Sequence, residues 1–362
     1  MNPPDTVRVL AASAQGLTTP GFRARVMVLR PELARHGVLV EPSVLFTQAE
    51  VDAFSRGGLK LRVTVLLSAR RRLARRLATT SRANGVSLIQ RQVDLLPVLR
   101  LERRAAATRR LIWDVDDAIW LDSSRAAGGH ELSVLKGTYR KVKWLASRAD
   151  RIVAANAYLA DFLSRYSDSV DVVPSVVETR SVTPRRHDDG EELVFGWIGS
   201  ATTVPYLLRL APAIRRVSQE LSPHPVKLLV VGGTFPCEVG YSVASVPWSI
   251  DHERQALNRI DVGLMPMPDN AWTRGKSAYK ALQYMSAGIP VVADDVGITS
   301  GVVEHGRGGF VVRDEAGWVD ALTALGRDPE LRARLGHHGR LRVDKDFSVV
   351  RWAPVLAQVL RG

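Results

Sequence analysis

The sequence predicts an α/β protein made of two doubly wound parallel sheets. Short apolar runs alternate with helix-forming segments from the first residues onward, which is typical of parallel sheets covered by helices on both faces. A polar, charged stretch at residues 183–192, TPRRHDDGEE, interrupts this alternation and has the composition of a linker. The alternation then restarts, and 362 residues are enough for two domains.

In the first half, strands are expected where β-branched and other apolar residues cluster. The opening strand, Val7–Ser13, precedes a polar turn at residues 14–21 and a helix at residues 22–36. These elements form an expected N-terminal domain at residues 1–185. Its further strands are expected at residues 38–46, 86–90, 111–115, 151–154 and 170–173.

The second half repeats the pattern and forms an expected domain at residues 186–347. After its first strand, Thr202 or Thr203 can cap a helix, and Pro205 suits the first turn of that helix. Residues 348–362 are expected to form a final helix, because the apolar side chains of the tail fall on one helical stripe. The strands are expected at residues 193–199, 227–233, 262–267, 289–293 and 310–313.

Composition restricts the class of protein. The chain is 46% hydrophobic with a mean hydropathy near zero, and it contains no apolar run long enough to span a bilayer. Its start, MNPPDTVRVL, lacks the basic and apolar segments of a signal peptide, so we expect a cytoplasmic protein. A single cysteine, Cys237, excludes an internal disulfide and a cysteine-cluster metal site, and we interpret it as a packing residue.

The positive charge is concentrated in one stretch. Residues 60–110 hold 14 basic and 2 acidic residues, a net charge of +12, whereas the whole chain carries +13. Such a field attracts an anionic acceptor, an acidic membrane surface or nucleic acid, although a merely solvated face has the same composition. We expect peripheral contact with the inner face of the membrane through the region Arg70–Arg110. Two expected helical clusters dominate it: Arg70, Arg71, Arg72, Arg75 and Arg76, then Arg100, Arg103, Arg104, Arg109 and Arg110.

The most informative segment is RGKSAYKALQYMSAGIPVVAD at residues 274–294. Gly275 permits close backbone approach and opens an expected helix, whose first amides lack intrahelical partners and suit a diphosphate. Lys276, Lys280 and Gln283 fall at i, i+4 and i+7, on one face of that helix. A surface helix with solvated lysines is the alternative interpretation.

This segment resembles the donor-site motif of glycosyltransferase family 4, retaining enzymes of the GT-B architecture. In that architecture two Rossmann-like domains face each other across a cleft, and the last helix crosses back to the first domain. The family motif has two glutamates, and Gly275 and Gln283 stand at their positions here. The sequences FGWIGSATTVPY at residues 195–206 and GKSAYKALQYMSAGIPVVA look like a bacterial subgroup in which Gly-Lys replaces the first glutamate.

The resemblance implies a donor site in the second domain. The loop that often carries an arginine and a lysine has neither here, so we assign the diphosphate to Lys276 and Lys280, with Lys276 as the principal catalytic residue. Gly16, after the first strand, matches a family glycine near the donor diphosphate, but it also suits an ordinary turn. Trp248 is equally compatible with a core position. The other expected donor-binding residues are Gly199, Ser200, Thr202, Gly232, Glu253, Gly275, Ser277 and Gln283.

Acceptor-binding residues are expected in the first domain. Asp116 and Asp117, in WDVDDAIW, follow an expected strand and can orient a sugar hydroxyl, although a capping pair is the alternative. Arg23 can reach a phosphate or carboxylate, whereas Arg25 is expected on a solvated face. The Asp-x-Asp spacing could bind a divalent metal in another glycosyltransferase architecture, but we expect no metal and no other cofactor here.

The expected activity is transfer of a sugar from a nucleoside diphosphate sugar to a hydroxyl of a saccharide, lipid-linked or natural-product acceptor, with retention of configuration. The arginine- and alanine-rich composition suggests a bacterium with a high GC content. Three alternatives stay open: a nucleotide-sugar epimerase, a non-catalytic relative, and a basic protein that binds a membrane surface or nucleic acid. Nucleic acid is the least expected partner, because it leaves the motif at residues 274–294 unexplained.

Overall fold

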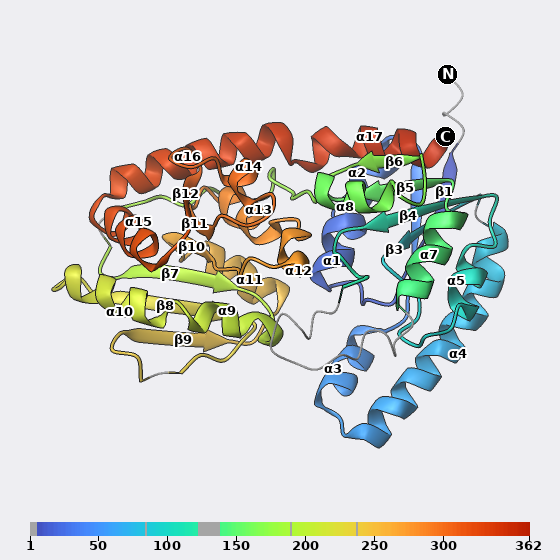
Figure 1. Ribbon diagram of the computed structural model, residues 1–362, viewed down its shortest axis with the longest axis horizontal. Coiled ribbons are helices and arrows are strands. Elements are labelled where there is room, and N and C mark those ends of the chain that lie inside the picture. Colours follow the sequence, from blue (N-terminus) through green and yellow to red (C-terminus); the bar gives the residue numbers. More distant parts are fainter. Residues whose placement is uncertain (1–5, 84, 122–137, 189, 237) are drawn as a thin grey trace. The chain divides into compact units, whose positions relative to one another are not determined.

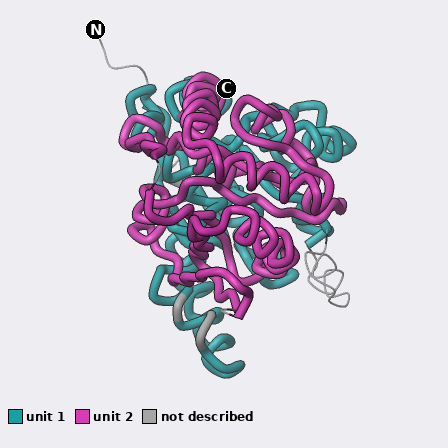
Figure 2. Tube along the Cα trace, turned by 90° about the vertical axis from the view of Figure 1, so that its left-hand side faces the viewer, with its two compact units in different colours: residues 1–176, 349–362 teal, residues 177–348 magenta. Residues whose placement is uncertain are grey.

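The computed structural model describes residues 6–83, 85–121, 138–188, 190–236 and 238–362, so Cys237 lies outside the described residues. The chain divides into two compact units: unit 1 holds residues 1–176 and 349–362, and unit 2 holds residues 177–348 (Figure 2). Unit 2 begins at Val177 instead of residue 186, because Val177 pairs with Ser348 and its N–H donates to the carbonyl of Phe347.

Unit 1 is built on a six-stranded parallel sheet (Figure 1). The strand order is β2-β1-β3-β4-β5-β6, so the order reverses between β1 and β3. Side groups at the carboxyl ends of β1 and β3 therefore flank the place where ligands of such sheets commonly bind. The strands are β1 Val7–Ser13, β2 Val38–Val44, β3 Val86–Gln90, β4 Arg110–Val115, β5 Arg151–Ala154 and β6 Val170–Val172.

The last helix of the chain, α17 (Val349–Arg361), belongs to unit 1. Its buried residues, including Leu356 and Leu360, share a core with Val9 and Phe22. The expected single helix at residues 22–36 is wrong: it is divided into α1, a π-helical turn η1 and α2. The helices before α17 are α1 Pro20–Phe22, η1 Arg23–Met27, α2 Arg30–Arg35, α3 Gln48–Arg56, α4 Leu59–Ala83, α5 Arg100–Ala105, α7 Thr138–Arg148 and α8 Ala157–Leu163.

Unit 2 has a second six-stranded parallel sheet, in the order β12-β11-β10-β7-β8-β9 (Figure 1). This is the order of a dinucleotide-binding Rossmann sheet, and it reverses between β7 and β10. The two doubly wound sheets that the sequence predicts are thus confirmed. The strands are β7 Leu193–Ile198, β8 Val226–Val231, β9 Ser242–Val246, β10 Val262–Met265, β11 Val291–Asp294 and β12 Gly309–Val312.

Apolar residues fill both faces of this second sheet, because successive side chains of a strand point to opposite sides. Phe195 and Trp197 of β7 belong to one core cluster, whereas Val194 and Ile198 belong to the other. The helices are η2 Ala201–Thr203, α9 Val204–Leu208, α10 Ala211–Glu220, α11 Ile250–Leu257, α12 Ala271–Arg274, α13 Tyr279–Ser286, α14 Thr299–Val303, α15 Glu315–Arg327 and α16 Pro329–Asp346.

Among the described residues, none of the helices combines the length and the apolar character that crossing a bilayer requires.

Candidate functional site

The segment expected to open one helix at Gly275 instead forms two helices. Asn270 caps α12 by accepting from the N–H of Thr273, and Gly275 closes that short helix. The next helix, α13, begins only at Tyr279. The residue before it, Ala278, is buried and has a left-handed backbone with φ of 51°. A side-chain-bearing residue in this conformation costs on the order of 1–3 kcal/mol, and such strain is concentrated at functional sites.

Lys276 and Ser277 therefore lie in the connection between α12 and α13, while Lys280 and Gln283 lie on α13 itself. Each lysine is placed over an indole ring. The ammonium of Lys276 is 4.9 Å from the ring centroid of Trp272, and that of Lys280 is 4.4 Å from the centroid of Trp197. Cations over aromatic faces are attracted by the ring quadrupole. Sequence reasoning missed both tryptophans, although Trp272 precedes Lys276 by four residues.

The environment of Lys280 disfavours its charged form. Burial, followed by the nearby charge of Lys276, lowers the pKa of Lys280 from its ordinary 10.5 to about 7. A bound anion would reverse both effects, because it compensates for desolvation and screens the repulsion between the two ammonium groups. The described unit 2 thus holds a pair of cations whose charges favour a multiply charged anion.

Two glycines allow the backbone to come close to these lysines. Gly199 follows β7, and a Cβ there would lie 2.9 Å from the ammonium of Lys280 and 2.2 Å from the ring of Trp197. Gly232 follows β8 with φ of +88°, and a Cβ there would lie 2.1 Å from the carbonyl oxygen of Gly199. A side chain at either position would clash with these atoms. The two strand ends therefore form a backbone-lined floor beside Lys280.

Two residues shortly after Gly199, Ser200 and Thr202, carry hydroxyl groups. Ser200 precedes η2, and its Oγ lies 2.8 Å from Oγ1 of Thr202. Ser200 is exposed, as is Thr202, so both hydroxyls are accessible as hydrogen-bond donors. They lie in the loop after β7, one of the two strands at which the sheet order reverses. The α12–α13 segment follows the other, β10.

Trp248 and Glu253 adjoin the same floor. The indole N–H of Trp248 donates to a carboxylate oxygen of Glu253 at 3.0 Å, and a Cβ on Gly232 would lie 3.1 Å from the Cβ of Trp248. Glu253 is buried on α11. Burial raises the pKa of Tyr284 on α13, and the charge of Glu253 adds to the shift, so the carboxylate lies near that helix. Gln283, also buried, is the residue before Tyr284.

Unit 1 holds the remaining predicted residues, at its own strand ends. Gly16 lies in a turn after β1, where its carbonyl accepts from the N–H of Thr19 at 3.2 Å and a Cβ would meet Val51 at 3.3 Å. Arg23 opens the π-helical turn and is partly buried. The expectation that Arg25 is solvated is wrong. Arg25 is buried and forms an ion pair with Asp114 at 2.7 Å, because the π-helical turn directs it into the sheet end.

Asp116 is held in an ionic and hydrogen-bonded network. Arg91 contacts it at 2.5 Å and also lies 3.3 Å from Asp117, and the amide of Gln90 donates to Asp116 at 2.7 Å. Burial alone would raise the pKa of Asp116, but the Arg91 ion pair and hydrogen bond outweigh it and hold the pKa below its ordinary range. Asp116 is therefore a permanently ionised acceptor of hydrogen bonds. Arg91 has a left-handed φ of 58°, which sequence reasoning did not detect.

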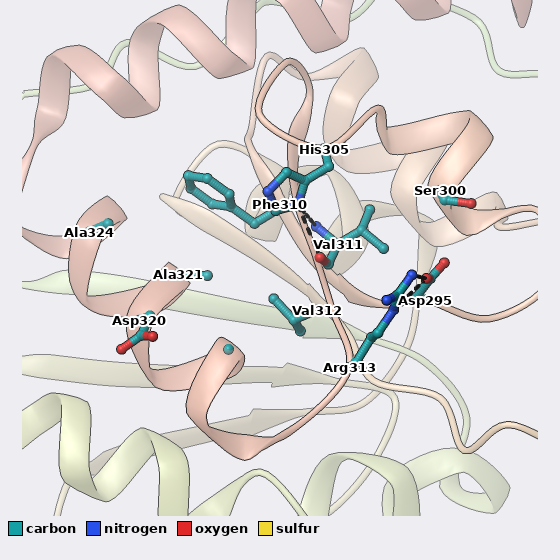
Figure 3. A pocket seen from close by; sticks show the side chains of 11 residues that line it. Asp295, Ser300, His305, Phe310, Val311, Val312, Arg313, Asp320, Ala321 and Ala324 are labelled. Carbon is teal, nitrogen blue, oxygen red and sulfur yellow. Dashed lines mark hydrogen bonds and ion pairs between the residues drawn. The ribbon is translucent and has the colours of Figure 1, made fainter.

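A separate pocket of about 710 Å³ lies beside β12, between α14 and α15 (Figure 3). It contains none of the predicted site residues. Phe310, Val312 and Ala321 give it a largely apolar lining, and Arg313 and Asp295 at its edge bind each other at 2.9 Å. Asp320 adds a second carboxylate to the lining. Across the described ranges, no three His, Cys, Asp or Glu side chains are grouped so that they could hold a metal ion.

Part of the sequence is similar to known glycosyltransferases. Residues 192–328 match the family model described as "Glycosyl transferases group 1", which covers most of unit 2. Two curated relatives, from Pseudarthrobacter chlorophenolicus and Gordonia bronchialis, are both named D-inositol 3-phosphate glycosyltransferase and are each 27% identical over 60% and 56% of this chain. The chain spans about half of the length of these relatives, 54% and 50%.

Solved structures resemble the whole chain in fold. A sucrose-phosphate synthase from Thermosynechococcus elongatus has a TM-score of 0.67 at 15% identity and is matched over 98% of both chains. The HepE protein of Anabaena, solved with UDP-glucose, has a TM-score of 0.67 at 14% identity over 98% of this chain and 99% of that one. At such low identity the likeness confirms the two-domain α/β fold alone.

Proposed function

We propose that this chain is a retaining glycosyltransferase of family 4, which moves a sugar from a nucleoside diphosphate sugar to an acceptor hydroxyl. The observation that carries the proposal is the pair Lys276 and Lys280, whose amines repel each other when both are protonated, with Lys280 beside the glycine at the end of β7. A diphosphate carries negative charge that both ammonium groups attract, and glycine backbone can approach such a ligand closely.

In the proposed mechanism, the two lysines stabilise the charge that develops on the diphosphate as its bond to the anomeric carbon breaks. Such stabilisation is strongest where the groups are fixed in advance and water is excluded. The acceptor oxygen attacks the anomeric carbon on the face that the diphosphate leaves, and its proton passes to the departing phosphate oxygen. The lysines supply the positive charge that a metal would otherwise contribute, so the proposal requires no metal.

The donor base and the acceptor are proposed from the surroundings of the site and from the relatives. Trp248 and Glu253 are assigned to the nucleoside, and HepE, solved with UDP-glucose, favours uridine as the first base to test. Asp116, Asp117 and Arg23 of unit 1 are assigned to the acceptor. Since both curated relatives are named for D-inositol 3-phosphate, a phosphorylated polyol is the first acceptor to test.

The donor is tested first. A thermal-shift series with uridine, guanosine, thymidine and adenosine diphosphate sugars should show stabilisation by one base. The donor that stabilises is then incubated with and without acceptors, since an epimerase converts the donor alone. Failure of all four donors to stabilise the protein would remove the basis of the proposal.

The catalytic assignment is tested by Lys276→Ala, which should lower transfer by several orders of magnitude while the protein stays folded. Lys345→Ala is the matched control, because Lys345 is exposed on α16. Turnover by purified Lys276→Ala at a rate close to that of the Lys345→Ala control would contradict the assignment.

A further inference from the structure

The first half of α4 exposes an unusual mixture of side chains. Leu59, Val63 and Leu67 have exposed fractions of 79%, 48% and 41%, although large apolar residues are normally covered. Figure 1 shows this end of α4 extending, with α3, beyond the sheet of unit 1. The helix core contacts begin further along, at Ala69 and Leu73, which are buried. The first turns thus present apolar side chains to solvent.

Basic residues lie on the same stripe. Lys60, Val63, Leu67 and Arg71 are spaced at i, i+3, i+7 and i+11, which places them on one face of a helix, and Lys60 and Arg71 are exposed. Over its 25 residues α4 contains eight basic residues and no acidic one. Two apolar side chains, Val63 and Leu67, are thus flanked by two cations, Lys60 and Arg71, along one exposed face; these four residues are here called the α4 stripe.

Several arginines of the two expected clusters are bound within unit 1. Arg70 pairs with Asp94 at 2.8 Å, and Arg72 pairs with Glu50 at 2.8 Å. Arg76 lies 3.4 Å from Glu41, and Arg104 donates to the carbonyl of Ala74. These contacts fix α4 against the unit, whereas Arg71 of the same cluster is exposed on the α4 stripe.

We infer that the α4 stripe binds the surface of a bilayer rich in anionic phospholipid. Basic side chains are attracted to acidic headgroups, and leucine and valine gain free energy when they enter the boundary between headgroups and acyl chains. A helix with both features lies in the plane of the interface. The inference concerns unit 1 alone and does not depend on the proposed transfer reaction.

The apolar members distinguish a membrane from nucleic acid. Phosphate-backbone binding uses arginine and lysine together with polar or aromatic side chains, and it gains nothing from exposed leucine and valine. A lipid surface uses both kinds of side chain. Removing the apolar residues while leaving every charge in place is therefore the decisive change.

The experiment measures flotation of the full chain with vesicles of neutral phosphatidylcholine, or of phosphatidylcholine with about one third phosphatidylglycerol. The wild type should float with the acidic vesicles, and less so as salt increases. Val63→Ser with Leu67→Ser should weaken binding about tenfold or more. Lys60→Glu with Arg71→Glu should weaken it at least as much.

Two matched controls carry the same chemical changes elsewhere. Leu341→Ser with Val350→Ser alters residues with exposed fractions of 51% and 38%, and Arg334→Glu with Lys345→Glu alters exposed charges on α16. Both should bind as the wild type does, and circular dichroism melting should show every variant folded.

Three outcomes would overturn the inference. The wild type fails to float with acidic vesicles, or the Val63→Ser, Leu67→Ser protein floats as well as its Leu341→Ser, Val350→Ser control. The third concerns an RNA duplex. If the wild type and the Val63→Ser, Leu67→Ser protein bind it and the Lys60→Glu, Arg71→Glu protein does not, the α4 stripe is a nucleic-acid surface.

Discussion

Binding of UDP to unit 2 should be accompanied by uptake of a proton on Lys280. In the ligand-free protein, burial and the charge of Lys276 hold the pKa of Lys280 at about 7, so at pH 8 the amine is largely neutral. The negative charge of the diphosphate favours the ammonium form. Binding at pH 8 therefore draws one proton from the buffer onto this side chain.

The number of protons taken up follows from the lowered pKa of Lys280. A group with a pKa of about 7 is roughly 10% protonated at pH 8, so full protonation on binding takes up ~0.9 proton. Each pKa unit corresponds to about 1.4 kcal/mol, and a shift from 10.5 to about 7 is on the order of 5 kcal/mol at most. Because the folded pKa is lowered, the ligand-free protein should become more stable as pH rises from about 7 towards 10.5.

The assay is isothermal titration calorimetry of UDP at pH 8 in two buffers that differ in ionisation enthalpy. The slope of the observed enthalpy against the buffer enthalpy gives the number of protons taken up. Lys280→Met keeps the apolar stem of the side chain and removes the titrating amine, so its slope should fall to near zero. A wild-type slope of zero, or an equal slope in Lys280→Met, would refute the reasoning.

Two further substitutions test internal contacts, one within unit 2 and one within unit 1. Gly232→Ala should destabilise unit 2 by about 2 kcal/mol and weaken UDP binding, because its Cβ would lie 2.1 Å from the carbonyl of Gly199 at φ of +88°. Thermal melting and titration measure this, with Gly301→Ala as control because nothing lies within 4 Å there; equal values for the two variants would contradict it. Lys141→Met should cost unit 1 about 3–5 kcal/mol in urea unfolding, because it leaves the buried carboxylate of Glu102, 2.8 Å away, without its cation. Lys143→Met, at an exposed position, should cost little, and equal urea midpoints would show that the ion pair contributes nothing.

The strands of both sheets were accessible to sequence reasoning because buried parallel strands are short continuous apolar runs. Val7–Ser13 and Val86–Gln90 match β1 and β3 at both ends. The strand β9, Ser242–Val246, was missed because it lies at the sheet edge, is partly exposed, and carries no such run. The other edge strands, β2, β6 and β12, do carry apolar runs and were expected from the sequence.

The sequence indicated that the 274–294 segment lies near the strand ends of unit 2, but it did not indicate the backbone conformation of that segment. Lys280 of this segment lies beside Gly199, as the ends of parallel strands lead one to expect. Nothing in the helix-forming sequence AYKALQY indicates that Ala278 is left-handed, because tertiary packing imposes that conformation. Likewise, the buried Arg25 pairs with the carboxylate of Asp114, which lies 89 residues further along the chain, and no local pattern can reveal such a pairing.

The return of α17 to unit 1 has a consequence for synthesis of the protein. A ribosome makes residues 1–176 first, but the helix that covers Val9 and Phe22 arrives only after all of unit 2 has been translated. Domains otherwise tend to fold in the order in which they emerge. Part of the unit 1 core therefore stays uncovered until α17 has been made. Unit 2 can complete its own fold before unit 1 does. A chain cut after Ser348 would keep unit 2 whole and leave unit 1 exposed to chaperones and proteases.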